Sequence, residues 1–491
     1  MPALRVASCA MRSVWLIAAA TCVMGCAPST NFKRPATDLP SAYRAAEQET
    51  AADRTLAEYG WWDVYQDKTL TALIRRALER NRDLRLAAAR VAEARATLGI
   101  AEYGPLPSLS AGASYTPSRV SQVAAQPIAP GLTEYRRSWR ATIDASYEVD
   151  FWGRLSALSE AAKADVYALE FARETVMATL VGDIATAYFD LLALDQQLAI
   201  SESTIATRQR FLDLTRSRLR LGVATKLDVD RAQANLSAVQ ATIPDLRRRI
   251  AQGENLLAFL SGATLGPLER DKPELDRVVE PPSVPAGLPS KLLERRPDVR
   301  QAEQAIVGAN ARLASQRAAL LPSFSLTGQF GSDARELAGF LTAPSRLWSL
   351  GTGILMPILN AQRNRYQVDA AAAREVQAIE QYQRVVEQSI REVADSLIAR
   401  RDFYEVQTAL REQAKALRDV NRVVLQRYEA GVSSYFEVID AQRDHLAAEL
   451  ALSQAQRNLL VSSVQLYKAL GGGWQRDDVP ETRPAVPAPK S

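Results

Sequence analysis

The residues of this chain whose types and spacing could do chemistry are mostly carboxylates, and they follow two similar segments. Glu437 and Asp440 stand three residues apart around the end of GVSSYFEV, residues 431–438. Asp228, Asp230 and Arg231 stand around the end of the matching GVATKLDV, residues 222–229. Like charges at this spacing repel mildly on a helix, but the helix dipole favours acids in a first turn. We therefore expect both groups to begin helices, where Arg231 could pair locally with Asp228.

Catalytic or metal chemistry has little support in the sequence. His445 is the only histidine, so histidine-based acid–base or metal chemistry is not expected. It falls on a helical seam, at the position equivalent to Leu236, and we interpret it as a packed or partly hydrated seam residue. No nucleophile, general base or metal cluster stands out, and we predict no enzyme, no metal and no cofactor. The net charge of +4, with both signs interspersed, does not indicate nucleic-acid binding.

The two segments belong to a duplication with a period of about 210 residues, too long for a solenoid repeat. Leu106-Pro-Ser-Leu-Ser returns as Leu321-Pro-Ser-Phe-Ser, and Ala232-Gln233 returns as Ala441-Gln442. These matches indicate duplicated halves of one domain. We divide the chain into a leader (1–25), an N-terminal segment (26–80), a first repeat (81–262), a linker (263–296), a second repeat (297–470) and a tail (471–491).

The first residues predict export. Arg5 and Arg12 precede an apolar run that is too short to span a membrane, as in a secretory signal. Cys26 directly follows Gly25, which resembles a bacterial lipobox and predicts a lipidated mature N-terminus. An ordinary signal peptide with a chance cysteine is the alternative. After cleavage only Cys26 remains, so no intrachain disulfide is expected. No later segment reads as a membrane-spanning helix, so any membrane crossing would use strands.

Two pairs of segments alternate apolar and polar residues with the period of a β-strand. They lie within 108–148, around a loop at 117–137, and within 322–357, around a loop at 331–346. Each strand has about ten residues, enough to cross a bilayer when tilted. Arg140, Asp144 and Glu148 share the polar face, which suits water on one side and lipid on the other. They could line a lumen or simply be solvated, and a soluble two-sided sheet is the alternative.

A predicted hairpin of long helices, 154–262 or 364–470, follows each strand pair. Apolar residues keep a 3-4 spacing on both helices of each hairpin, as in coiled coils. Pro244 is the exception and should kink the first return helix, because it removes an internal hydrogen bond. Gly222 and Gly431 fit helix C-cap positions with positive φ, which alone would explain them. The turn residues are Gly222, Val223, Ala224 and Thr225 in the first hairpin, and Gly431, Val432, Ser433 and Ser434 in the second.

Four membrane-type strands cannot close a barrel, and an unpaired strand edge in lipid is very costly. The smallest common barrels have eight strands, so the chain must oligomerise. A dimer would supply eight strands and a trimer twelve. A lumen with charged side chains favours the wider assembly, because side chains fill small barrels.

Several segments, in this order of elements, resemble the TolC-like outer membrane efflux family, and more closely its lipid-anchored multidrug-efflux (NodT-type) branch. They are Trp61-Trp62 with Asp67 and Leu70, Asn81 to Leu84, YEVDFWGR at 147–154, Leu288-Pro289, LLERRPDVRQAE at 292–303, Leu321-Pro322, Tyr428 to Gly431 and Ala469 to Gly472. The resemblance covers roughly residues 40–475, and LLERRPDVRQAE is its strongest segment.

The resemblance implies a mainly α-helical, internally duplicated protein with a small transmembrane β part. It implies a homotrimer with one outer-membrane β-barrel of twelve strands, continuous with a periplasmic coiled-coil α-barrel of twelve helical segments. Such a protein is a passive exit duct for small molecules and drugs, located in the outer membrane and reaching into the periplasm. A periplasmic adaptor would join it to an inner-membrane pump, typically a proton-driven one of the RND type.

The resemblance also implies roles for the residues at the two turns. The turns would form the periplasmic tip that meets the adaptor. Glu437 and Asp440 match acidic positions that line the closed aperture, where threefold symmetry would gather about six carboxylates into a ring, a usual device for cation preference. Asp228, Asp230 and Arg231 could join hydrogen bonds that hold the aperture shut. Ordinary helix-starting acids remain the alternative at both turns.

Other functions remain open from the sequence. Type I protein secretion and metal-ion efflux use ducts of the same kind, although the lipobox and LLERRPD favour small-molecule efflux. A structural periplasmic lipoprotein with coiled-coil arms is a non-channel alternative, but it would not need four alternating strands. Cargo selection is expected to lie mostly in the pump, because a duct need not bind its cargo.

Overall fold

The computed structural model describes residues 34–36, 40, 43, 67–121, 134–270 and 289–472 of the 491-residue chain. The predictions for the leader, Cys26, Trp61-Trp62 and the tail from 473 onward concern residues outside these ranges. The chain divides into two units, here called the sheet unit and the helical unit. The sheet unit contains Met1–Pro35, Ala92–Ala168 and Ala302–Tyr382, and the helical unit contains Ala36–Val91, Leu169–Gln301 and Gln383–Ser491.

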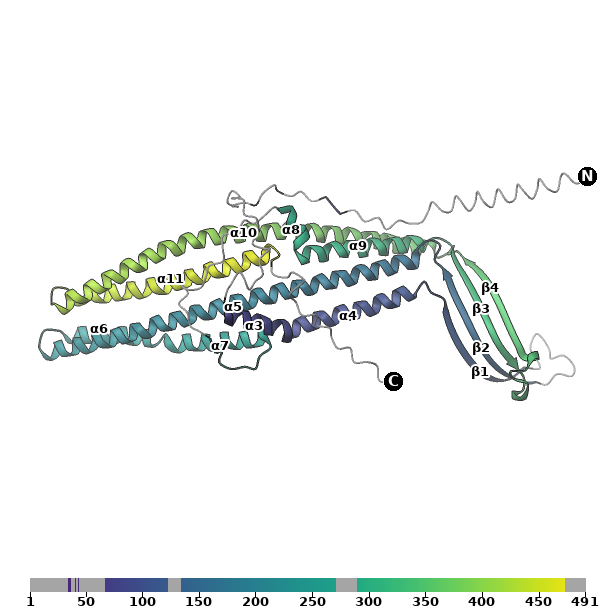
Figure 1. Ribbon diagram of the computed structural model, residues 1–491, viewed down its shortest axis with the longest axis horizontal. Coiled ribbons are helices and arrows are strands. Elements are labelled where there is room, and N and C mark those ends of the chain that lie inside the picture. The colour runs from purple at the N-terminus through teal and green to yellow at the C-terminus, as the bar shows by residue number, and fades with distance from the viewer. Residues whose placement is uncertain are drawn as a thin grey trace, which may run out of the picture. The chain divides into compact units, whose positions relative to one another are not determined.

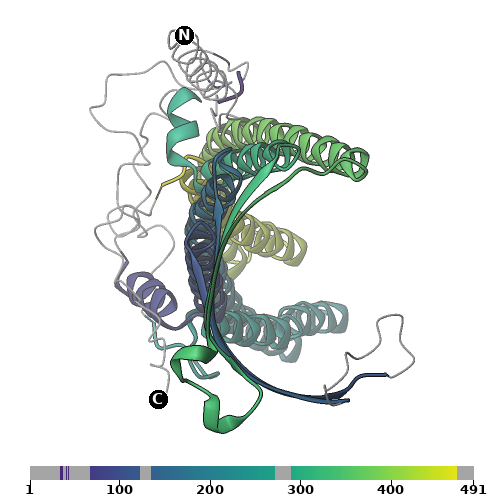
Figure 2. The same cartoon turned by 90° about the vertical axis from the view of Figure 1, so that its right-hand side faces the viewer.

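One antiparallel sheet forms the centre of the sheet unit. Its four strands follow chain order and lie side by side as a curved sheet (Figures 1 and 2). They are β1 (Ser108–Arg119), β2 (Tyr135–Val149), β3 (Ser323–Ala334) and β4 (Arg346–Leu355). Because the sheet is open, β1 and β4 each have one edge without a partner strand in the described part of the chain.

The register gives the sheet one apolar face and one polar face. Ala111, Ile143, Phe330 and Trp348 lie opposite one another in one row across all four strands. The neighbouring row points to the other face and consists of Ser110, Asp144, Gln329 and Ser349. The apolar face is uncovered, since Ile143, Phe330 and Trp348 are 53%, 60% and 77% exposed.

Two strands extend further than the alternation predicted. β1 continues to Arg119 through Pro117, which lies opposite Arg137. Proline is tolerated there because β1 is an edge strand, with half of its amides pointing away from the sheet. β3 continues to Ala334, four residues into the predicted loop, and the rest of that loop contains two short 3-10 turns, Leu337–Gly339 and Ala343–Ser345.

Long helices dominate the chain. They are α3 (Lys68–Arg80), α4 (Arg82–Tyr103), α5 (Arg154–Arg220), α6 (Lys226–Gln240), α7 (Ile243–Ser261), α8 (Pro289–Arg295), α9 (Pro297–Ala318), α10 (Ala361–Glu429) and α11 (Tyr435–Ala469). In the helical unit, α5 turns back into α6 and α7, and α10 turns back into α11 (Figure 1). The fold is therefore mainly helical with a small strand part, as the sequence predicted.

The predicted 3-4 pattern marks the buried stripes of the hairpin helices. Ile184, Leu191 and Leu212 on α5 are at most 1% exposed, and so are Val438 and Leu466 on α11. One hydrophobic core in the helical unit combines side chains from α3, α5, α7, α8, α10 and α11. Packing of these buried stripes stabilises the long helices, because intrinsic helix propensity alone contributes little stability.

α5 is more apolar than the sequence analysis indicated. It contains an 18-residue window that is apolar enough to cross a membrane by length and composition, and the prediction that no such segment follows the leader was wrong in this respect. However, 67% of that window is buried within the protein. α5 supplies Leu180, Ile184, Tyr188 and Leu192 to the helical core, so its composition is explained by burial.

Pro244 interrupts the first return helix, whereas the sequence analysis predicted a kink within one helix. α6 ends at Gln240 and α7 begins at Ile243, which places Pro244 in the first turn of α7. A missing N–H is harmless there, because first-turn amides have no intrahelical acceptor. Ala241 and Thr242 keep right-handed helical dihedrals, and their amides donate to Ser237 and Val239 at 3.0 Å each. The equivalent helix of the second repeat, α11, is continuous.

Two equivalent joints fasten the ends of the return helices. In the first, Asn81 lies between α3 and α4 and is 3% exposed. Its Oδ1 accepts from the amides of Asp83 and Leu84 at 2.8 and 3.1 Å, which caps α4. Its Nδ2 donates to the carbonyl of Leu260 near the end of α7, at 2.9 Å. One side chain thereby stabilises a helix start and holds the end of a distant helix.

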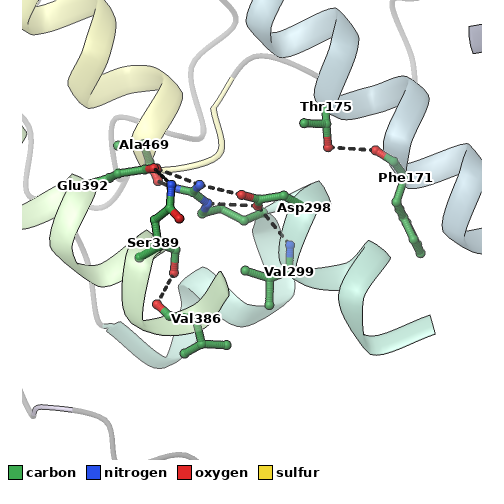
Figure 3. A network of polar contacts seen from close by, with 10 residues as sticks. Phe171, Thr175, Asp298, Val299, Val386, Ser389, Glu392 and Ala469 are labelled. Carbon is green, nitrogen blue, oxygen red and sulfur yellow. Dashed lines mark hydrogen bonds and ion pairs between the residues drawn. The ribbon is translucent and has the colours of Figure 1, made fainter. Parts of the chain in front are cut away.

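The second joint uses Arg296, between α8 and α9. It donates to the Asp298 carboxylate at 2.6 and 3.0 Å and to the Ala469 carbonyl at 3.1 Å, and it pairs with Glu392 at 2.8 Å (partners in Figure 3). Gly471 follows α11 with φ of +72°, and a Cβ there would lie 3.2 Å from the Arg295 backbone. The LLERRPD and ALGG segments, which carry the resemblance, are therefore in direct contact.

Candidate functional site

The two hairpin turns, where the sequence placed its carboxylates, are built alike. Gly222 and Gly431 have φ of +76° and +78°, the left-handed conformation that glycine adopts without strain. The amide after each glycine bonds to the carbonyl five residues earlier, which closes a Schellman motif. These bonds join Val223 to Arg218 at 3.0 Å and Val432 to Arg427 at 2.9 Å.

Each return helix begins with a capping box. The Asp228 amide donates to Thr225 Oγ1 at 3.2 Å, and the Thr225 amide donates to the Asp228 carboxylate at 2.9 Å. Ser434 and Glu437 exchange the same two bonds at 3.3 and 3.1 Å, and Ser433 adds a third bond to Glu437 at 2.6 Å. Both acids therefore satisfy amides that a helix start leaves without partners.

Glu437 and Asp440 lie on successive turns of α11 in different electrostatic surroundings. Hydrogen bonds from Ser433 and Ser434 hold the pKa of the exposed Glu437 carboxyl below its ordinary value. Asp440 is paired with Arg443 at 3.1 Å, and its side chain is 35% exposed. The two carboxylates can present negative charge to water, but each already has local partners.

The first turn distributes its charges differently from the prediction. Lys226 pairs with Asp230 four residues later. The Asp228 carboxylate accepts from Thr225, and within the described residues Arg231 forms no ion pair with Asp228. Instead of the predicted pair with Arg231, Asp228 forms a capping box with Thr225, whose backbone amide lies within hydrogen-bond distance of the Asp228 carboxylate.

An aromatic cluster lies behind the turns and joins the two hairpins. Phe211 of α5 lies 5.2 Å from Tyr428 of α10 and 5.5 Å from Tyr435 of α11, between ring centroids. Val229 of α6 and Val438 of α11 belong to the same buried cluster. Burial, and then the charge of Asp228, raise the pKa of Tyr435 to about 12. These aromatic contacts could not be predicted from the sequence, because only the helical spacing of the residues is visible in the chain.

Arg218 also links the hairpins, and no pattern in the sequence indicates this role. Its guanidinium lies 4.2 Å from the Tyr428 ring centroid. It donates to the carbonyls of Tyr428 and Glu429 at 2.7 and 3.2 Å, where α10 ends. A cation at this position satisfies carbonyls that a helix terminus leaves without partners and complements the negative end of the helix dipole.

Apolar side chains project from both turns. Five of them are more than half exposed, at 78%, 72%, 56%, 65% and 63%, and they are Leu221, Val223, Leu227, Val432 and Phe436. Ala224 between them is half-buried. A group of exposed apolar side chains at two adjoining turns is typical of a protein-binding surface.

His445 lies on the seam, as the sequence indicated, with a side chain that is 20% exposed. Its Nε2 is 3.1 Å from Glu449, which also pairs with Arg418 of α10 at 3.2 Å. Among the residues that the structure describes, no group of three or more His, Cys, Asp or Glu side chains could hold a metal ion.

The charged residues of the sheet form a connected row on its polar face. Arg140 donates to Gln329 Oε1 at 2.9 Å, and Gln329 Nε2 donates to Asp144 at 2.6 Å. Glu148 pairs with Arg154, at the start of α5, at 2.8 Å. The three residues singled out in the sequence therefore share one face, and hydrogen bonds across β2 and β3 hold two of them.

Comparisons with known proteins agree with this architecture. The cation efflux system protein CusC of Escherichia coli is 31% identical over 93% of this chain and 98% of its own length. The toluene efflux pump outer membrane protein TtgI of Pseudomonas putida is 34% identical over 84% of this chain and 87% of its own length. Among solved structures, the open state of the Neisseria gonorrhoeae MtrE outer membrane channel is 30% identical with a TM-score of 0.81, over 91% of this chain and 98% of that one.

The family comparison covers both repeats. The model of the outer membrane efflux protein family matches residues 73–263 and 288–472. The first match contains part of α3 and then α4 to α7 with β1 and β2, and the second contains α8 to α11 with β3 and β4. With an open amphipathic sheet, two long hairpins and two equivalent turns, this chain belongs to the outer membrane efflux protein family.

Proposed function

We propose that this protein is the outer-membrane exit duct of an efflux system. Three copies would close one barrel of twelve strands, and their hairpins would form one periplasmic tube. The duct would be passive, and an inner-membrane pump of the proton-driven RND type would supply energy through a periplasmic adaptor. A lipid on Cys26 would give an additional anchor in the outer membrane.

The observation that carries this proposal is the open amphipathic sheet. An uncovered apolar face with exposed Ile143, Phe330 and Trp348 suits lipid. The opposite face joins Arg140, Gln329 and Asp144 by hydrogen bonds, which suits a water-filled lumen. The unpaired edges of β1 and β4 would pair with neighbouring copies, because lipid tolerates no open sheet edge.

The two turns are proposed as the periplasmic tip. The exposed Val223 and Val432 would contact the adaptor, together with the other turn residues. Glu437 and Asp440 would ring the aperture, where about six carboxylates from three chains favour cations. Asp228 and Asp230 would act indirectly, by fixing the first turn beside the aperture through Thr225 and Lys226. Arg231 would join the hydrogen bonds between chains that hold the aperture shut.

The cargo is proposed to be small molecules selected by the pump. Relatives of similar identity are named for cations and for toluene. Since the duct architecture is common to both, differences in cargo are expected to arise upstream of it.

A matched pair of substitutions on β2 tests the role of the sheet. Ile143→Arg places a charge on the apolar face, whereas Ser146→Arg places one on the exposed polar face. A charge facing lipid near the bilayer midplane costs about 2–4 kcal/mol. We expect Ile143→Arg to lose membrane insertion and trimer assembly, and Ser146→Arg to retain both.

Planar-bilayer conductance and chemical crosslinking of the full-length protein provide the measurements. The unsubstituted protein should form trimers and conduct ions. Equal insertion of the two variants would contradict the assignment of the faces, and a protein that assembles without conducting would contradict the duct.

A further inference from the structure

An Arg-x-Trp motif occurs twice in the sheet, as Arg137-Ser-Trp139 in β2 and Arg346-Leu-Trp348 in β4. Arg137 and Arg346 are separated by the same number of residues as Gly222 and Gly431, so the motif belongs to the duplication. Both strands run from the motif toward the long helix that follows them. The motif therefore marks the ends of β2 and β4 that are remote from α5 and α10.

Both arginines lie on the apolar face. Trp348 lies opposite Phe330, and Trp139 lies opposite Tyr115 with ring centroids 4.3 Å apart. Because side chains alternate along a strand, the arginine two residues before each tryptophan shares its face. Arg137 and Arg346 are exposed, and within the described residues neither makes an ion pair or a side-chain hydrogen bond.

Arg119 of β1 adds a third cation near the first motif. It lies opposite Tyr135, with its guanidinium 5.6 Å from that ring centroid, and diagonal to Arg137 on the same face. Arg119 is paired with Glu134 at 2.8 Å, so its charge is largely compensated. Arg137 therefore remains the cation available to a ligand at this position.

An apolar band that ends in exposed aromatic rings and then in unpaired arginines has the composition of a membrane–water boundary. Aromatic rings occupy the headgroup level, and basic side chains bind anionic headgroups there. We propose that Arg137 and Arg346 bind phosphate groups of an anionic glycolipid in the outer leaflet, with Trp139 and Trp348 beside them. This rests on the proposed function, in which the sheet is part of the outer-membrane wall.

The occupant is a lipid and not a soluble anion because the arginines continue an apolar surface. Trp348 is 77% exposed, and its ring would lie in water if a small anion were the only ligand. The duplication places one such position in each half of the sheet, so every copy would hold two lipid phosphates on its outer surface.

Arg136 provides a matched control, because it is exposed and adjacent to Arg137 but points to the polar face. Full-length protein in detergent would be titrated with bisphosphorylated lipid A and with the dephosphorylated lipid, and binding followed by native mass spectrometry. Each arginine should contribute about fivefold to the affinity. Arg137→Gln with Arg346→Gln should weaken binding about 25-fold, whereas Arg136→Gln should leave it unchanged.

Several outcomes would overturn the proposal. They are equal loss in the Arg136→Gln variant, equal binding of the dephosphorylated lipid, or competition by inorganic phosphate at the concentration of the lipid. Arg137→Lys with Arg346→Lys keeps the charges and should restore most of the binding, which separates recognition from misfolding. Conductance of the same samples distinguishes failure of the lipid-binding inference from failure of the proposed duct function. A protein that conducts ions but binds no lipid refutes only the lipid-binding inference. Binding without conductance refutes only the duct.

Discussion

Arg218 offers the sharpest test of how the two hairpins are held together. It lies on α5, yet its guanidinium stacks on Tyr428 and donates to the carbonyls of Tyr428 and Glu429 at 2.7 and 3.2 Å. In the duct, release of this contact would let the tip of the second hairpin move away from the first. We predict that Arg218→Gln increases the population of the detached tip.

The size of the effect follows from the contacts. Hydrogen bonds to charged groups contribute about 1.5–3 kcal/mol. We take about 1 kcal/mol for the two hydrogen bonds of Arg218 together, because its side chain is only half-buried and water screens it. The cation–π contact adds about 0.5–1 kcal/mol at a partly exposed site. Loss of both amounts to about 1.5–2 kcal/mol, which corresponds to a 10- to 30-fold larger detached population.

Hydrogen exchange of the amides in residues 428–436 measures this population, and the open probability in planar bilayers reports its effect on conduction. Arg220→Gln is the control, because among the described residues the Arg220 side chain donates only to Ser217 on its own helix, at 2.8 Å. Exchange should rise 10- to 30-fold in Arg218→Gln and stay near the unsubstituted rate in Arg220→Gln. Equal exchange in the two variants would refute the assignment of Arg218 as the link.

Further predictions concern the second turn and the helical core. Glu437→Gln with Asp440→Asn keeps the N-cap hydrogen bonds and should lower the preference for cations in bilayer recordings. Unchanged ion selectivity would contradict the proposal that these residues line the aperture. The folded-state pKa of Glu437 is lowered, so its contribution to stability is present above its ordinary value of 4.5 and lost as the pH falls through the folded value. The protection factors of the amides at this turn, which are corrected for the intrinsic pH dependence of exchange, should therefore fall on acidification, and should not do so in Glu437→Gln. Gly431→Ala should destabilise the turn by about 1–2 kcal/mol in thermal unfolding, from strain at positive φ alone, since a Cβ there meets no atom within 4 Å. The Arg270 side chain is 2% exposed and pairs with Asp195 at 2.7 Å. Arg270→Met should lower the free energy of unfolding by about 3–5 kcal/mol, because the Asp195 carboxylate would stay buried without this cation, and an unchanged Tm would show that water reaches this site.

Much of the fold could be predicted from periodicity because burial imposes it. The alternation in β1 to β4 exists because one face of the sheet is apolar, and the 3-4 spacing of Ile184 or Val438 exists because those positions are buried. At Pro244 a kink within one helix was predicted and the structure has a break between two helices, since a proline inside a helical pattern indicates either a kink or a new helix start. Only the surrounding hydrogen bonds, with Ala241 and Thr242 still helical, decide between them.

The site was less predictable than the fold. The positions of Gly222, Gly431 and the acids of both turns were visible, because capping residues are local in sequence. The cluster of Phe211 with Tyr428 and the contact of Arg218 join segments about 210 residues apart. No local pattern records such a contact, and a single sequence without its fold offers no way to pair those residues.

The open edges of the sheet also govern how the protein could reach the membrane. β1 has 12 residues and β4 has 10, and every second residue of an edge strand directs its N–H and C=O away from the sheet. About eleven such pairs would enter hydrocarbon unsatisfied, at several kcal/mol per group. A single copy therefore cannot insert by itself, and the copies must meet before or during insertion. Insertion should then follow a high reaction order in protein concentration, so modest dilution in the periplasm would slow biogenesis far more than it slows the folding of one chain.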